Sequence, residues 1–250
     1  MRKIPIFVGF DQREAAVYHT FCQSVIEHST VPVSFHPLHG PMLNNFDGQR
    51  DGTNRFIYSR YLVPYLMGYE GWAIFADGDM VVTEDISKLW ELRDWKKAVQ
   101  VVKHDYKTKA PRKFIGTPIE ADNVDYPRKN WSSVILFNCS HPSNRCLNID
   151  MVSNGGPEFL HRFHWLNEDE IGEIPDSWNW LCGEYEPNDE ANLYHYTLGA
   201  GGFESAADGD HADEWHKYFL DALEMIGEDP VDQVSRSAFR APIEDLRVMK

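Results

Sequence analysis

The sequence predicts an α/β fold with a mixed, mainly parallel sheet that is flanked by helices. Short apolar runs recur along the first half of the chain, and amphipathic segments alternate with these runs. This βαβ alternation is typical of a mainly parallel sheet whose faces are covered by helices. With 250 residues, of which 42% are hydrophobic, the chain can bury a sizeable core without disulfides. We find no internal repeat and no low-complexity linker, so we expect a single domain over residues 1–250.

The predicted elements begin with a buried strand over 4–10. Asp11 and Glu14 then have the spacing of a capping box, and apolar residues four apart from Val17 onward mark one face of the helix that follows. The segment 104–129 is long, polar and rich in proline and lysine, which is typical of a functional or mobile loop. Further strands are predicted over 33–38, 72–76, 98–102, 133–137 and 193–196, and further helices over 56–66, 86–92, 145–152, 158–165 and 212–226.

The composition excludes several classes of protein. There are 24 Lys and Arg against 39 Asp and Glu, and the net charge of −15 argues against nucleic acid as the main partner. No apolar run approaches the ~18 residues of a membrane span, and the opening residues run straight into a strand, so neither an integral membrane segment nor a signal peptide is predicted. Four cysteines, none spaced as Cys-x-x-Cys, indicate buried thiols in a reducing compartment, and we expect a cytoplasmic protein.

The most informative motif is the acidic pair Asp77-Gly78-Asp79. It directly follows an apolar strand, so both carboxylates are expected at the carboxyl edge of the sheet, where open α/β sheets bind ligands. Two close carboxylates repel each other unless a cation, a proton or a donor lies between them, and hard oxygen ligands suit Mg²⁺ or Mn²⁺. Gly78 leaves room for a ligand to approach the backbone. A strand that ends in an ordinary polar turn explains the same spacing equally well.

The pair also fits a phosphatase motif. Asp77-Gly-Asp-Met-Val81 matches the Asp-x-Asp-x-Thr/Val pattern of haloacid-dehalogenase-type phosphatases, in which the first Asp is a nucleophile and the second is a general acid. In those enzymes the nucleophile follows the first strand, whereas the first strand of this chain ends at Asp11.

Three segments around the acidic pair together resemble a GT-A glycosyltransferase. They are Ser59–Tyr65, Gly71–Met80 and Asp85–Trp90, and they are most similar to glycosyltransferase family 8, the glycogenin-like and lipopolysaccharide-galactosyltransferase-like enzymes. The resemblance implies that Asp77 and Asp79 hold a divalent metal ion against the diphosphate of a sugar nucleotide. An imidazole ligand together with carboxylates favours a borderline ion, so we expect Mn²⁺ before Mg²⁺. The resemblance also implies that Arg60 braces the acidic pair, for which we expect a bidentate ion pair with Asp77.

The second half of the chain extends this resemblance. His195-Tyr-Thr-Leu-Gly199 is similar to the family's late His-x-x-Gly motif, whose histidine is the third protein ligand of the metal. The glycine lies one position later than in the family, and the Lys-Pro-Trp that follows in many members is absent here. Backbone N–H groups of the turn at Gly199 and Gly201 are therefore expected to hold phosphate in place of that lysine.

The remaining site residues also come from the resemblance. The first strand and its turn are expected to hold the nucleotide base, Lys129 to reach the phosphates, Asn138 to lie near the donor sugar, and Asp169, or Glu170 in its place, to act as a sugar-binding or catalytic carboxylate. The predicted nucleotide-sugar site comprises Phe10, Asp11, Arg13, Ser59, Arg60, Asp77, Gly78, Lys129, Gly199 and Gly201, the predicted metal ligands are Asp77, Asp79 and His195, and the predicted catalytic residues are Arg60, Asn138 and Asp169.

These features together predict transfer of a hexose from a nucleotide-diphosphate sugar, with UDP-sugar as the expected donor and retention of anomeric configuration. The acceptor is an unknown sugar, lipid or protein. Residues 1–103 form the nucleotide-binding half, 104–227 the half that binds acceptor and completes the metal site, and 228–250 a C-terminal surface segment. Two rival functions stay open: a phosphohydrolase that uses Asp77 as nucleophile, and a non-catalytic nucleotide-sugar binder.

Overall fold

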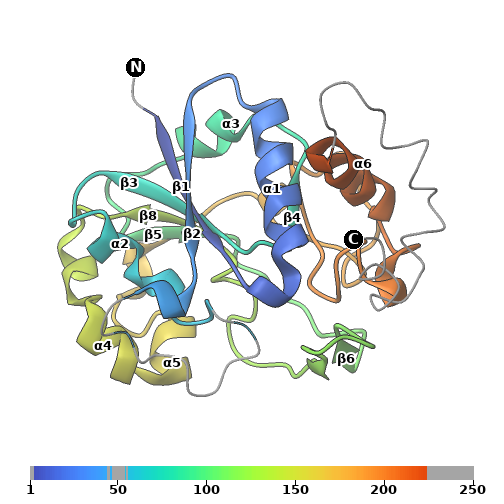
Figure 1. Ribbon diagram of the computed structural model, residues 1–250. Coiled ribbons are helices and arrows are strands. Elements are labelled where there is room, and N and C mark those ends of the chain that lie inside the picture. Colours follow the sequence, from blue (N-terminus) through green and yellow to red (C-terminus); the bar gives the residue numbers. More distant parts are fainter. Residues whose placement is uncertain (1–2, 44–45, 47–53, 55, 224–250) are drawn as a thin grey trace.

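A computed structural model describes residues 3–43, 46, 54 and 56–223, and its core is a six-stranded sheet (Figure 1). The strand order is β2-β1-β3-β8-β5-β9, and every strand except β8 points in the same direction. The mixed, mainly parallel sheet that the sequence predicts is thereby confirmed. The strands span Ile4–Gly9 (β1), Val33–Leu38 (β2), Trp72–Ala76 (β3), Val99–Val101 (β5), Val134–Asn138 (β8) and Ile171–Glu173 (β9).

Helices cover both faces of this sheet because successive strand residues point to opposite sides. Ile6 and Val8 of β1 pack with Phe21 of α1 (Ala15–His28) in one buried cluster that also takes in α3 (Ile86–Glu91). Phe7, between them in sequence, packs on the opposite face with Leu160 and the residues of α2 (Val63–Leu66), α4 (Ile149–Asn154) and α5 (Gly156–His161). Figure 1 shows these two groups of helices on opposite sides of the strands.

A second, three-stranded sheet lies beside the main one. Its order is β10-β11-β4, with β10 at Trp180–Leu181, β11 at Leu193–His195 and β4 at Met80–Val82, the strand directly after the acidic pair. Helix α6 (Ala212–Leu223) lies alongside α1 and packs Trp215 and Tyr218 into a third buried cluster (Figure 1). This second sheet joins β10 and β11, from the late part of the chain, to β4, which follows β3 and the acidic pair in sequence.

Several predicted elements are wrong in extent. The helix expected over 56–66 is a turn followed by a 3₁₀ segment, Ser59–Leu62, and the single turn of α2, because Pro64 cannot donate the backbone hydrogen bond that a continuous α-helix needs there. The helix expected over 145–152 divides into a 3₁₀ segment, Pro142–Cys146, and α4. The expected capping box at Asp11 caps the 3₁₀ turn Gln12–Glu14 through the backbone N–H of Arg13.

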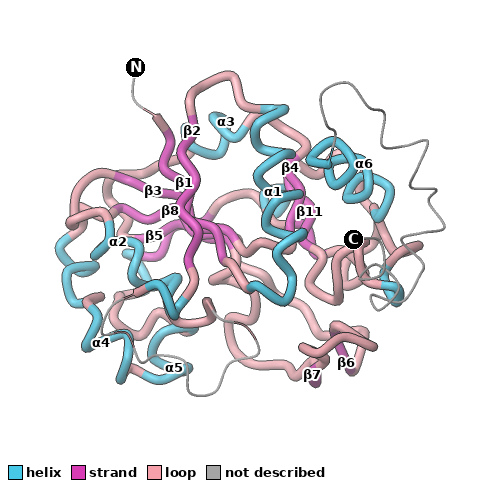
Figure 2. Tube along the Cα trace, viewed as in Figure 1, coloured by secondary structure: helices cyan, strands magenta, loops and turns pink. Residues whose placement is uncertain are grey.

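The long polar segment carries a small hairpin. Strands β6 (Arg112–Lys113) and β7 (Ala121–Asp122) pair antiparallel and lie apart from the central sheet (Figure 2). Among the described residues, no helix has both the length and the apolar character that a bilayer span requires. All four cysteines are free thiols. The segment predicted over 228–250 lies outside the described residues.

A buried histidine couples the stability of this fold to pH. His104 is 7% exposed, and its Nδ1 lies 2.7 Å from the hydroxyl of Tyr185. Burial lowers the pKa of His104 to about 3, and any positive charge on nearby His195 acts in the same direction. Its ring therefore stays neutral in the folded protein at a pH at which the unfolded chain takes up a proton, so the folded state loses stability as the pH falls below about 6.5.

Replacing His104 should make the free energy of unfolding depend less on pH in the acidic range. Between pH 7 and pH 5, His104→Gln should lose about 2 kcal/mol less unfolding free energy than the wild-type protein, the full linkage of one group with an unfolded pKa of about 6.5. Chemical denaturation at the two pH values measures this difference. Equal losses in the two proteins would contradict it.

Candidate active site

The acidic turn between β3 and β4 is held in place by backbone hydrogen bonds on both sides. The N–H of Asp77 donates to the carbonyl of Ser133 at 2.9 Å, and the carbonyl of Asp79 accepts from the N–H of Tyr196 at 2.9 Å. The first bond ties the turn to the start of β8, and the second ties it to the end of β11. The positions of both carboxylates are thus set by two strands distant in sequence.

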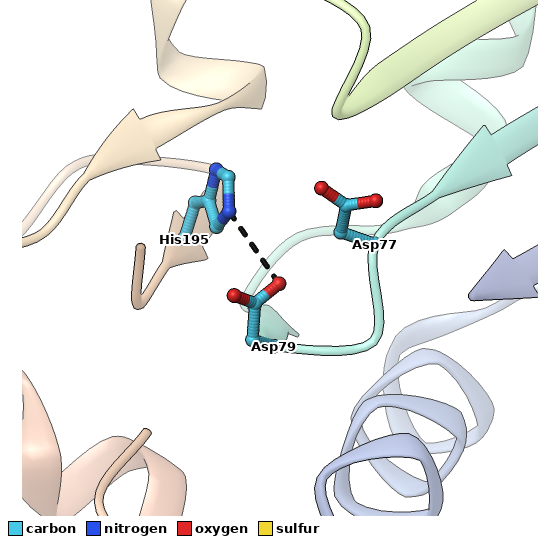
Figure 3. A group of neighbouring side chains, drawn as sticks. All are labelled: Asp77, Asp79 and His195. Atoms are coloured by element: carbon cyan, nitrogen blue, oxygen red, sulfur yellow. Dashed lines mark ion pairs between the residues drawn. The ribbon is translucent and has the colours of Figure 1, made fainter. Parts of the chain in front are cut away.

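Three potential metal ligands converge at this turn (Figure 3). One ligand atom from each of Asp77, Asp79 and His195 lies within 4.8 Å of the others, and the three side chains are 13%, 15% and 3% exposed. His195 reaches the turn because β11 pairs antiparallel with β4, with His195 opposite Met80. The structure therefore brings together the three predicted ligands, close to the spread of atoms that each lie about 2 Å from one ion.

The orientation of His195 is set by a side chain that the sequence analysis did not single out. Nδ1 of His195 lies 2.9 Å from Oδ1 of Asn179, and Nδ2 of Asn179 donates to Oγ of Ser133 at 2.8 Å. Because Asn179 presents its oxygen, Nδ1 carries a proton, and in the neutral imidazole Nε2 then carries a lone pair. That lone pair faces Oδ1 of Asp79 at 3.4 Å.

Two acceptors that face each other in a buried site repel unless a cation lies between them. Oδ1 of Asp79 is buried and accepts no hydrogen bond among the described residues, and Oδ1 of Asp77 is buried with only the ion pair to Arg60. Two carboxylates and a neutral imidazole form a suitable donor set for a borderline divalent ion. The residues present therefore fit a metal site.

Arg60 forms an ion pair with Asp77 of the acidic pair. Its Nη1 lies 3.0 Å from Oδ1 of Asp77 and donates to the carbonyl of Ser132 at 2.7 Å, while its Nε donates to the carbonyl of Ile57 at 3.1 Å. The guanidinium is thus spread over three acceptors, and the ion pair uses one nitrogen, not the bidentate pair that we expected. Burial raises the pKa of Asp77, and the charge of Arg60 acts in the opposite direction.

A third carboxyl group lies near the pair. Burial raises the pKa of Glu14 to about 8, and Asp79 and Asp11 add to the shift. Glu14 is therefore protonated at neutral pH and adds no negative charge to the site.

A cavity of about 400 Å³ opens beside the acidic pair. Its wall is mixed in character, with polar side chains from the turn, the start of β8 and α5, and apolar rings between them. The lining residues are Asn54, Ile57, Tyr58, Arg60, Asp77, Asp79, Lys113, Phe114, Tyr126, Asn130, Ser132, Ser133, Pro157, Glu158, His161, Arg162, His195 and Thr197. A pocket of this size with a few convergent polar groups is the usual form of a small-molecule site.

Lys113, not Lys129, supplies the lysine of this cavity. The ammonium of Lys129 donates to Oδ1 of Asn123 at 2.6 Å and to the carbonyl of Val124, and so it is occupied away from the cavity. Lys113 lines the cavity, and it has no hydrogen bond or ion pair among the described residues. Burial lowers the pKa of Lys113, while Asp79 and Asp77 act to raise it. The only sequence signal for Lys113 was its place in the long lysine-rich loop.

Asn138, Asp169 and Glu170 do not lie at this site. Because β8 runs antiparallel to β3, Asn138 pairs with Trp72 at the start of β3, and the first residues of β8 lie beside Asp77. Asp169 and Glu170 precede β9, which is parallel to β5, and they therefore lie at the same far edge of the sheet as Asn138. Asn130, just before β8, lines the cavity in place of Asn138.

The predicted base-binding residues lie outside the cavity lining. Both carboxylate oxygens of Asp11 accept from the guanidinium of Arg13, at 2.9 and 2.6 Å, and Phe10 packs edge-on against Tyr18 and His39. They stand at the end of β1, next to β3, so their role toward a nucleotide base stays a prediction.

The other predicted contacts have local structural partners. A Cβ on Gly78 would lie 2.8 Å from the carbonyl of Gly9, so the glycine allows the close approach of β1, and its role toward a ligand stays a prediction. Ser59 is buried and donates to the carbonyl of Phe56. Gly201 packs against Trp215 of α6, and Gly199 has a φ of 143°, which favours glycine. Phosphate binding by this turn stays a prediction.

Comparison with known proteins supports the fold and identifies a relative. No family model matches the sequence. Protein CDI of Arabidopsis thaliana is 40% identical over 221 residues, which cover 84% of this chain and 83% of that protein.

Three solved structures are similar in fold. The galactosyltransferase LgtC, in complex with donor and acceptor sugar analogues, has a TM-score of 0.58 at 14% identity, over 92% of this chain and 100% of that one. The apo bifunctional glycosyltransferase WbbM has a TM-score of 0.56 at 14% identity, and the Streptococcus pneumoniae glycosyltransferase GlyE has 0.58 at 16%. The match to WbbM covers 91% of this chain and 50% of WbbM, and the match to GlyE covers 88% of this chain and 60% of GlyE. The GT-A fold that the sequence predicts is confirmed.

Removing the orienting amide should weaken metal binding without unfolding the protein. In Asn179→Ala, His195 loses the acceptor that holds its proton on Nδ1, and changes of this kind typically cost 10- to 100-fold in metal affinity. Isothermal titration with Mn²⁺ measures the effect. Asn192→Ala is a suitable control, because the Asn192 amide donates to Ser177 outside the cavity. Unchanged Mn²⁺ affinity in Asn179→Ala would contradict the assignment.

Proposed function

Because the chain belongs to the family of Arabidopsis thaliana Protein CDI and has the GT-A glycosyltransferase fold, we propose that it is a metal-dependent hexosyltransferase. The donor is a nucleotide-diphosphate sugar, with UDP-sugar preferred, and the metal is Mn²⁺ before Mg²⁺. The acceptor is a sugar, lipid or protein, and transfer retains the anomeric configuration. Residues 1–103 bind the nucleotide, residues 104–227 complete the metal and acceptor sites, and the enzyme acts in the cytoplasm.

One observation carries this proposal: Nε2 of His195 lies 3.4 Å from a buried carboxylate oxygen of Asp79. Their contact becomes favourable when both coordinate one cation. Asp77 provides the third ligand, and the cavity beside the cluster provides the room for a substrate.

The local charges favour an anionic ligand once a divalent ion is bound. Arg60 and Lys113 offset the charges of Asp77 and Asp79, and Glu14 is neutral, so the ion's own charge remains uncompensated. The negative charge of a diphosphate compensates the positive charge of the bound ion. Without the ion, a chain with a net charge of −15 disfavours a diphosphate.

The protein residues have separate roles in the transfer. When bound, the metal ion supplies Lewis-acid stabilisation of the negative charge that develops on the leaving diphosphate. Arg60 keeps the Asp77 carboxylate in place, and Asn179 keeps the lone pair of His195 directed at the metal position. Lys113 places a fixed positive charge at the cavity wall, where it stabilises the same leaving group.

The rival functions make different predictions. A phosphohydrolase would need Asp77 as a nucleophile, but one of its oxygens is paired with Arg60, and the similar solved structures are glycosyltransferases. A non-catalytic binder would show the same affinities as the enzyme but no turnover.

A donor panel tests the proposed function directly. Thermal shifts with UDP-, GDP- and ADP-sugars, each with Mn²⁺, Mg²⁺ or EDTA, should show stabilisation by a UDP-sugar that requires the metal, because ligands bound only by the folded state raise the melting temperature. Asp79→Ala should abolish the metal-dependent shift. Slow hydrolysis of the stabilising donor distinguishes an enzyme from a binder. Equal stabilisation in EDTA would overturn the metal role.

Lys113 should contribute to diphosphate affinity. Lys113→Gln removes one charged contact of about 1.5–3 kcal/mol, so UDP should bind roughly 10- to 100-fold more weakly while uridine affinity changes little. Lys109→Gln is the matched control, because Lys109 belongs to the same loop but pairs with Glu186 at the surface. Equal losses for UDP and uridine would show that Lys113 acts on the fold and not on the phosphates.

A further inference from the structure

The end of the cavity formed by α5 is chemically unlike the metal end. Glu158, His161 and Arg162 line it, and Nη2 of Arg162 lies 2.9 Å from a carboxylate oxygen of Glu158. The predicted site did not include any residue of this helix. The wall therefore offers hydrogen-bond donors and acceptors that the proposed metal and diphosphate contacts do not use.

His161 is held rigidly at this end. Its Nδ1 lies 2.7 Å from the hydroxyl of Tyr61 and 3.1 Å from Oγ of Ser132. Burial lowers the pKa of His161 to about 3, with Arg60 and Lys113 acting in the same direction, so the ring is neutral. Burial also raises the pKa of Tyr61, so its hydroxyl stays protonated, and when this hydroxyl donates to Nδ1 the ring proton of the neutral imidazole is on Nε2.

The Nε2–H of His161 lacks an acceptor among the described residues. This nitrogen is buried, and the ring lines the cavity. His104 has the same features, a tyrosine at Nδ1 and a buried Nε2 without a partner, but it does not line the cavity. Location at the cavity wall therefore distinguishes His161, and a ligand hydroxyl there would accept its hydrogen bond.

The position of His161 relative to the metal cluster indicates which part of a substrate it meets. Ser132 contacts His161 through Oγ, and its carbonyl accepts from Arg60, which pairs with Asp77. Ser132 therefore connects the ring of His161 to Arg60, the arginine that pairs with Asp77 at the metal end of the cavity. In a nucleotide sugar, the diphosphate has the nucleoside ribose on one side and the transferred sugar on the other. The residues predicted to hold the nucleotide base, at the end of β1, lie outside the cavity lining, so the α5 end is assigned to the sugar.

We propose that His161, with Glu158 and Arg162, forms a subsite that binds the hydroxyls of the transferred sugar. This inference rests on the proposed function. A neutral N–H donor, a carboxylate acceptor and a guanidinium donor complement hydroxyl groups, which both donate and accept, and Tyr126 adds a partly exposed aromatic ring to the same cavity. His161 is thus a specificity-determining residue for the sugar, not for the nucleotide.

Paired affinities for a nucleotide with and without its sugar test this subsite. UDP, UDP-glucose, UDP-galactose and UDP-N-acetylglucosamine are titrated with Mn²⁺ at pH 7.5 into wild type, His161→Asn and His161→Gln. The asparagine amide can replace only the Nδ1 contacts, whereas the glutamine amide can reach the Nε2 position. We expect His161→Asn to bind the preferred UDP-sugar roughly 3- to 10-fold more weakly, the range of one neutral hydrogen bond, with UDP affinity unchanged. His161→Gln should recover most of this loss.

Controls separate the outcomes. His104→Asn should leave both affinities unchanged, and circular dichroism confirms that each variant is folded. A series of deoxy donors should include one that binds wild type and His161→Asn equally well, which identifies the hydroxyl that His161 contacts. Equal weakening of UDP and UDP-sugar in His161→Asn, no change in either, or a change confined to the acceptor KM would overturn the subsite. If wild type binds none of these nucleotides, the proposed function itself fails.

Discussion

The contact between His195 and Asp79 is the constraint on which the rest of the site depends. A histidine and an aspartate distant in sequence meet because β11 pairs with β4, and Asn179 fixes the tautomer that makes their contact unfavourable in the absence of a cation. Arg60 and Lys113 then compensate the two carboxylates. Each of these groups is needed because charge is buried, and a buried charge is tolerated only when it is paired.

Backbone hydrogen bonds hold this unfavourable cluster together. The turn is joined to β8 through the N–H of Asp77 and to β11 through the carbonyl of Asp79, and both strands belong to buried sheets. The apolar clusters on the two faces of the main sheet stabilise the strands that present the site. The local electrostatic cost is thus met by packing elsewhere, which is the usual relation between a functional site and its scaffold.

The sequence predicted those parts of the fold and site that depend on local pattern. Apolar runs marked the strands, and the spacing of Asp77 and Asp79 marked a turn at a sheet edge. Asn138 was misplaced because strand direction is a tertiary property: β8 reads as an apolar run in either direction, and only its pairing with β3 shows that its first residues, not its last, lie at the site. Asp169 lies at the same far edge for a related reason, because it precedes β9, which runs parallel to β5.

The two lysines show where sequence reasoning reaches its limit. Lys129 lies close to a recognisable strand, yet its ammonium is occupied by Asn123 and Val124. Lys113 lies in β6 of the small hairpin, where the sequence carries no motif, yet the N–H of Phe114 donates to the carbonyl of Leu198 at 2.8 Å and brings that hairpin to the turn after His195. That turn lacks the lysine expected from family resemblance. Electrostatic stabilisation requires a positive charge at a point in space, not at a point in the chain, so a lysine from a different segment can meet the same requirement.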